Sequence, residues 1–190
     1  ANAIHALLGP APPNVLYLYD RLALFHLAGT DRFGGGYREM IRGIKDCADA
    51  IGAKRVMTFA RCAPGFTAIK AGLDLHAERV IAISPVTTMT TNDMSEDARA
   101  PVLQRRLAQA LPEHERDILP QLMRQNDTRF DIFYNRAHRR DSEYARRISA
   151  APHVTLHPLD EPRQRDPIER LLEPPIGRIS DRFSATRIVS

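Results

Sequence analysis

The chemistry that this sequence could carry centres on one cysteine in the stretch FARCAPGFTA, residues 59–68. Cys62 lies between an apolar run typical of a strand and a run with helical spacing. Where a strand passes directly into a helix, one residue is held in a strained conformation with its side chain exposed. The first N–H groups of the helix point the same way and can stabilise an anion. Cys62 is thus placed to be a nucleophile, with the Ala63 N–H as oxyanion donor.

The residues around Cys62 also allow a structural role without chemistry. Cysteine is a small, often buried side chain and can merely fill its position. Pro64 is tolerated in a first helical turn, but it removes one N–H donor and disfavours a helical conformation at Ala63. The turn can therefore form while its capacity to stabilise an oxyanion is reduced. Gly65 leaves room for a close contact between helix and strand.

Five apolar runs predict the strands that would position this turn. Most are continuous rather than alternating, which is typical of strands buried on both faces of a parallel sheet. Amphipathic helical patterns fall between them, so we expect βαβ units with right-handed crossovers. The expected strands are 15–19, 55–60, 79–84, 130–135 and 153–159.

The helical patterns include three between strands and a longer excursion. The three short patterns cover 37–53, 65–75 and 142–151, whereas residues 87–129 predict a helical insertion between the third and fourth strands. We expect this insertion to cover part of the crevice above Cys62, because long insertions in α/β folds usually lie at the functional edge. Residues 1–190 are expected to form a single domain.

Composition narrows the class of protein. The chain has 190 residues, 43% hydrophobic and 26% charged, which is ordinary for a globular protein. Its net charge is +4, but acids interrupt the basic stretches, so we expect a mixed surface and no nucleic-acid or membrane partner. Two cysteines do not make a disulfide framework, no Cys/His spacing indicates a metal site, and no cofactor is predicted. We expect a cytoplasmic protein that is processed or is a piece of a longer chain.

The block from residue 51 to residue 85, IGAKRVMTFARCAPGFTAIKAGLDLHAERVIAISP, resembles the central part of the α/β-hydrolase superfamily. It is most similar to a bacterial subgroup associated with surface-polysaccharide or glycosyltransferase proteins, whose turn reads G-x-S-x-G-G with an alanine two residues on. Cys62 stands where that pattern has its serine, and both elbow glycines are replaced, by Ala60 and Pro64. A looser resemblance extends over 14–173. The resemblance implies a mainly parallel sheet of about five strands flanked by helices, with the strand at 55–60 at its centre.

The resemblance also implies where the other members of a catalytic triad should lie. They follow the nucleophile in the order acid, then histidine. Asp141 matches the acid position, although an acid there is equally well explained as a helix cap. The histidine is expected near residues 165–166, where the sequence has none. His138 is the most plausible substitute and His26 another, while His157 is expected to be a packed strand residue.

Two functions remain open on these grounds, so enzymatic activity is uncertain. The first is hydrolysis of an ester or acyl group by Cys62, Asp141 and His138, with the Ala63 N–H as oxyanion donor. Weak activity is predicted, because cysteine replaces serine, Pro64 replaces a glycine and the expected histidine is missing. The second is a degenerate hydrolase-like domain that binds a partner or a small saccharide-related ligand, linked to polysaccharide or glycan biosynthesis. Substrate and oligomeric state are left undetermined.

Overall fold

The structure is a computed structural model that describes residues 14–90, 100–124 and 127–160. Contacts divide the chain into two units, residues 18–160 and residues 1–17 together with 161–190. The unit of residues 18–160 contains all the strands and helices considered below. The expectation of a single domain over the whole chain stays a prediction.

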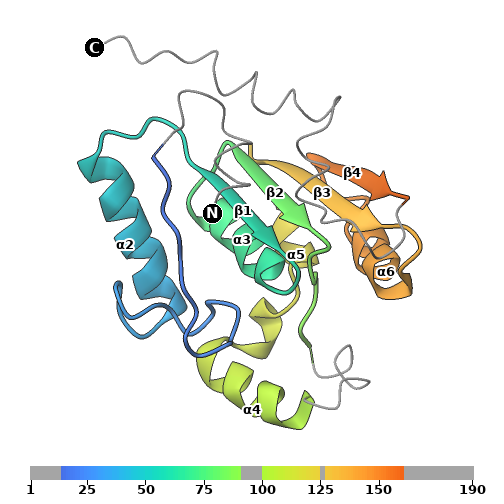
Figure 1. Cartoon of the computed structure of the whole chain (residues 1–190), viewed down its shortest axis with the longest axis horizontal. Coiled ribbons are helices and arrows are strands. Elements are labelled where there is room, and N and C mark those ends of the chain that lie inside the picture. The colour runs from blue at the N-terminus through green and yellow to red at the C-terminus, as the bar shows by residue number, and fades with distance from the viewer. Residues whose placement is uncertain (1–13, 91–99, 125–126, 161–190) are drawn as a thin grey trace. The chain divides into compact units, whose positions relative to one another are not determined.

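The described residues form a four-stranded parallel sheet, as the apolar runs indicated (Figure 1). Neighbouring strands pair in the order in which they occur along the chain, with Phe59 opposite Ile81 and Asp131 opposite Thr155. All carboxyl ends therefore meet at one edge of the sheet. The strands are β1 Met57–Arg61, β2 Arg79–Ile83, β3 Arg129–Asn135 and β4 Val154–Leu159.

The sheet differs from the prediction in two respects. The run 15–19 has no regular secondary structure and so is not a strand, and Val15, Leu16, Tyr17 and Tyr19 are each at least 36% exposed. Its composition suits a strand, but a strand also needs a hydrogen-bonded neighbour, which composition cannot supply. As a result β1, which was expected at the centre, lies at an edge of the sheet that the described residues form.

Helices follow the predicted positions closely. The patterns at 37–53 and 65–75 form α2 and α3, and the third pattern forms a helix that starts three residues earlier than expected. Gly52 has a positive φ of 66° directly after α2, as a residue that ends a helix often does. The helices are α2 Tyr37–Ala50, α3 Pro64–Asp74, α4 Ala100–Ala110, the 3-10 turn η1 Glu113–Glu115, α5 Leu119–Leu122 and α6 Arg139–Arg147.

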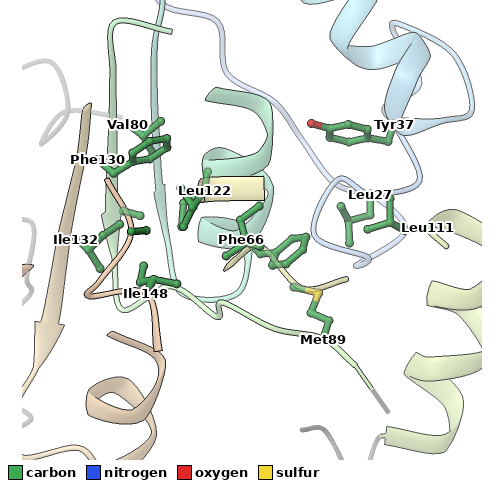
Figure 2. Close-up of a cluster of buried hydrophobic side chains, with 14 of the residues drawn as sticks. Leu27, Tyr37, Phe66, Val80, Met89, Leu111, Leu122, Phe130, Ile132 and Ile148 are labelled. Atoms are coloured by element: carbon green, nitrogen blue, oxygen red, sulfur yellow. The ribbon is translucent and has the colours of Figure 1, made fainter. Parts of the chain in front are cut away.

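The main core lies between one face of the sheet and the helices α3 and α6. Val80, Phe130 and Ile132 project from this face, and each is at most 1% exposed. They cluster with Phe66 of α3 and with Ile148, which directly follows α6 (Figure 2). Burial of such side chains stabilises the fold by about 2 kcal/mol each. This packing holds the N-terminal ends of both helices at the carboxyl edge of the sheet.

A buried lysine ties the segment between β2 and β3 to α3. The Lys70 side chain is 6% exposed, and its Nζ lies 3.0 Å from Glu115 Oε2 and 3.1 Å from Gln121 Oε1. Burial would raise the pKa of Glu115, but the hydrogen bond and charge of Lys70 outweigh burial and lower it. The helices α4, η1 and α5 do lie in the region predicted to be helical. Their coverage of the crevice above Cys62 stays a prediction.

Candidate functional site at the carboxyl edge of the sheet

Cys62 occupies the strand-to-helix turn that the sequence pattern predicted. It lies between β1 and α3 with a φ of 61°, in the left-handed region that residues other than glycine rarely adopt. Two backbone hydrogen bonds of 2.8 Å hold it there, from Cys62 N to Ile83 O and from Gly65 N to Cys62 O. The residue is exposed and its thiol is free. The turn therefore presents the sulfur above the carboxyl edge of the sheet.

The start of α3 offers few donors to an oxyanion. Pro64 has no N–H, and the Gly65 N–H is used by the Cys62 carbonyl. The Ala63 N–H has no acceptor among the residues that the structure describes. Gly65 makes the close contact that was expected of it, because a Cβ there would lie 2.6 Å from Pro85 Cβ. The turn thus keeps its tight packing and one available donor.

Asp141 lies beside Ser84, the residue next to Cys62 at the sheet edge. Arg61 pairs with Ile83, so Cys62 and Ser84 directly follow the paired ends of β1 and β2. Ser84 also has a positive φ, 46°, and its Oγ donates to Asp141 Oδ2 at 2.5 Å. His138 Nδ1 lies 2.9 Å from Asp141 Oδ1 and accepts a hydrogen bond of 3.3 Å from the Asp141 backbone N–H. The structure thus brings together Ser84, Asp141 and His138.

The thiol of Cys62 is not part of that hydrogen-bonded group. The structure describes six of the seven histidines, all except His5, and none of these six is hydrogen-bonded to Cys62. His138 contacts the acid rather than the thiol, and it also caps α6. Residues 165–166, where the family pattern expects a histidine, lie outside the described residues and contain none. Asp141 therefore lies between a serine and a histidine, whereas in a catalytic triad the histidine would lie between the thiol and the acid.

A strained loop, residues 20–28, reaches the N-terminal part of α3. Ala23, Phe25 and His26 all have positive φ values, and the Thr67 hydroxyl of α3 donates to the Phe25 carbonyl. Asp20 accepts from the backbone N–H of His26 at 3.0 Å. Burial lowers the pKa of His26 and outweighs the charge of Asp20, which would raise it. The Nδ1 atom of His26 is buried without a partner among the described residues.

Sequence patterns gave little indication of this loop. Asp20 stands at the end of an apolar run and His26 lies six residues later, but neither residue predicts a strained backbone. Residues in sparsely populated conformations often gather near functional sites, so the loop belongs to the candidate site.

His157 is engaged elsewhere. Its Nε2 lies 2.7 Å from Asp131 Oδ1, and its ring stacks on Phe133 at 4.5 Å. Arg79 Nε donates to the other Asp131 oxygen at 2.6 Å. The expectation of a packed strand residue is thus confirmed, and the residue also has a specific acidic partner. Among the described residues, no three histidine, cysteine or acidic side chains converge as metal ligands would.

Comparisons with known proteins give a distant likeness of fold. No protein-family model matches the sequence, and no curated protein matches it significantly. Among the described helices, none is long and apolar enough to span a bilayer. The chain is similar to the structure of MGS-MChE2, an α/β hydrolase enzyme from the metagenome of sediments from the lagoon of Mar Chica, Morocco. That match has 14% identity and a TM-score of 0.48, and it covers 72% of this chain and 64% of that one.

Proposed function

We propose that this chain is an α/β-hydrolase-like protein whose Cys62 accepts an acyl group from an ester. The observation that carries the proposal is the exposed Cys62 thiol on a strand-to-helix turn, with φ at 61° and the free Ala63 N–H beside it. A side chain held in this way approaches a substrate from above the sheet without further rearrangement. The same turn geometry would be costly at a position that only fills space.

The proposed reaction proceeds through a thioester. The Cys62 thiolate attacks the ester carbonyl carbon, and the Ala63 N–H donates to the oxygen that becomes negative. The C–O bond to the alcohol then breaks, and the alcohol leaves with a proton taken from water. Water hydrolyses the thioester, which releases the acid and restores the thiol. None of the described histidines is hydrogen-bonded to Cys62, so the thiol loses its proton to water and the leaving alcohol is protonated by water, without assistance from a base, and turnover is slow.

A second candidate is favoured by the position of Asp141. Its Oδ2 accepts from Ser84, and its Oδ1 lies 2.9 Å from His138 Nδ1, which is not hydrogen-bonded to Cys62, so Asp141 orients no base toward the thiol. Such an arrangement suits a domain that has lost catalysis and binds a partner or a saccharide-related ligand, including one of polysaccharide biosynthesis. In this case Ser84, Asp141 and His138 are a stabilising network and Cys62 is an ordinary thiol.

Acylation kinetics separate the two candidates. The protein is mixed with p-nitrophenyl acetate, and the burst of nitrophenol and the mass of the protein are followed. We expect a single acetyl group on Cys62, formed at least about tenfold faster than on N-acetylcysteine, because one oxyanion donor contributes at least that much. Cys62→Ala should abolish the burst. Cys47→Ala, which removes the other free thiol on α2, should leave it unchanged. Acylation no faster than that of N-acetylcysteine would favour the binding domain.

A further inference from the structure

We propose that a second site, on the flank of α6, binds the phosphate group of a small phosphomonoester. The site is a cavity of about 410 Å³ lined by Tyr134, Arg136, Ala137, Arg139, Ser142 and Arg146, and is called the arginine pocket below. Its volume falls within the usual range of ligand sites. None of the described residues that line it is acidic. The proposal is independent of any reaction at Cys62.

The period of the helix brings the arginines together. Arg139, Ser142 and Arg146 are three and four residues apart, so their side chains share one flank of α6. Arg136 precedes the helix and completes the group from the β3–α6 loop. Asp141 and the buried Ala145 are on a different side of α6, toward the sheet and Ser84. The arginine pocket is therefore separate from the candidate site around Cys62.

Local hydrogen bonds hold the loop that carries Arg136 before any ligand binds. Ser142 Oγ donates to the Arg136 carbonyl at 3.0 Å, and Arg136 N donates to Leu159 O at 3.1 Å. Asn135 Oδ1 accepts from Ala137 N at 2.9 Å. A backbone fixed in this way loses little freedom on binding, which favours affinity.

The three arginines differ in how they are held among the described residues. Arg146 uses its Nε for the Ser142 carbonyl and has no acidic partner among the described residues. Arg136 pairs with Asp160 and Arg139 with Glu143, both at 3.2 Å and both exposed. Exposed ion pairs contribute little, about 0.5 kcal/mol, so a ligand can displace them. Residues 136–147 contain five arginines and two acids, an excess of three positive charges where the whole chain has four.

The number of guanidinium groups favours phosphate over carboxylate. A guanidinium fork binds two oxygens of either anion, but three forks from two segments suit a tetrahedral group with three terminal oxygens. The cavity exceeds the size of phosphate alone, and half-buried Tyr134 provides a wall for an organic part. A small phosphomonoester therefore fits the arginine pocket.

Calorimetric titration with matched ligands tests the chemical class. Phenyl phosphate and benzoate share one ring and differ in the anion, and we expect phenyl phosphate to bind at least about tenfold more tightly. Inorganic phosphate should bind more weakly than phenyl phosphate, since it lacks the ring. Vesicles of phosphatidylcholine with phosphatidate offer the same group on a lipid. Binding to these vesicles without binding of phenyl phosphate would overturn the proposal, as would equal binding of benzoate or no binding of phenyl phosphate.

Variants locate the binding. Arg146→Gln and Arg139→Gln should each weaken phenyl phosphate binding about tenfold, the usual effect of one charge-assisted hydrogen bond. Arg146→Lys keeps the charge but loses the forked guanidinium group, so its affinity for phenyl phosphate should lie between those of the wild type and Arg146→Gln. Arg42→Gln, at an exposed arginine on α2, is the matched control and should bind like the wild type. These exposed side chains can change without unfolding, which circular dichroism verifies. Unchanged binding in both glutamine variants, or an equal loss in Arg42→Gln, contradicts the arginine pocket.

Discussion

Ser84 and Asp141 are joined by a hydrogen bond of 2.5 Å between Oγ and Oδ2, and Ser84 is held at a φ of 46°. Ser84→Ala removes this bond to a carboxylate and should lower the free energy of unfolding by about 2 kcal/mol. Ser84→Gly also loses the bond but tolerates the positive φ, so it should be the more stable variant by about 1 kcal/mol. Urea denaturation of the two variants measures the difference. Equal stability of both would show that the backbone strain has no energetic cost.

The strands and helices near Cys62 were predictable because their signals are local. Continuous apolar runs indicated β1 to β4, and spacing indicated α2 and α3. The contact between Ser84 and Asp141 was not predictable, because it depends on where α6 meets the end of β2, 57 positions away in the sequence. The expected strand at 15–19 failed for the same reason. Local composition indicates β propensity, whereas pairing depends on a neighbour from another part of the chain.

The turn at Cys62 depends on the absence of a side chain at Gly65. A Cβ at this position would lie 2.6 Å from Pro85 Cβ and 2.9 Å from Pro85 Cα, and backbone cannot easily move away. Gly65→Ala should therefore destabilise the fold by about 2 kcal/mol, as overpacking typically does. Thermal denaturation checks this. The matched control is Gly35→Ala, where a Cβ meets nothing within 4 Å, and it should stay within about 0.5 kcal/mol of the wild type. Similar values for both variants would contradict the tight contact.

Lys70 is predicted to anchor η1 and α5 to α3. Its side chain is 6% exposed, and Lys70→Ala removes the cation that lies 3.0 Å from Glu115 and 3.7 Å from Asp74 and opens a cavity. The free energy of unfolding should fall by about 3 kcal/mol. Lys70→Met keeps a packed aliphatic side chain and should lower the free energy of unfolding by less. Lys45→Met, at an exposed lysine of α2, should change stability by less than about 0.5 kcal/mol. If denaturation gave similar results for Lys70→Ala and Lys45→Met, the network around Lys70 would have no stabilising role.

Asp131 should make stability depend on pH in the acid range. Burial tends to raise its pKa, but the hydrogen bonds from His157 and Arg79 outweigh burial and lower the pKa below its ordinary value of 3.8. A carboxylate with a depressed pKa in the folded state stabilises the protein above the pKa of the unfolded chain. That stabilisation is lost as the pH falls from about 4 through the folded pKa. The pH dependence of stability therefore tests the contacts of Asp131 with Arg79 and His157.

The test compares two isosteric variants over a range of pH. Asp131→Asn removes the charge between Arg79 and His157, so at pH 7 it should lower the free energy of unfolding by about 2 kcal/mol. The gap from the wild type should narrow as the pH falls from about 4 through the lowered folded pKa, because the carboxylate becomes protonated first in the unfolded and then in the folded wild type. Asp127→Asn changes an exposed acid two residues before β3 and should follow the wild type within about 0.5 kcal/mol throughout. A gap for Asp131→Asn that stayed constant from pH 7 to pH 3 would mean that the stabilisation does not come from the charge of the carboxylate.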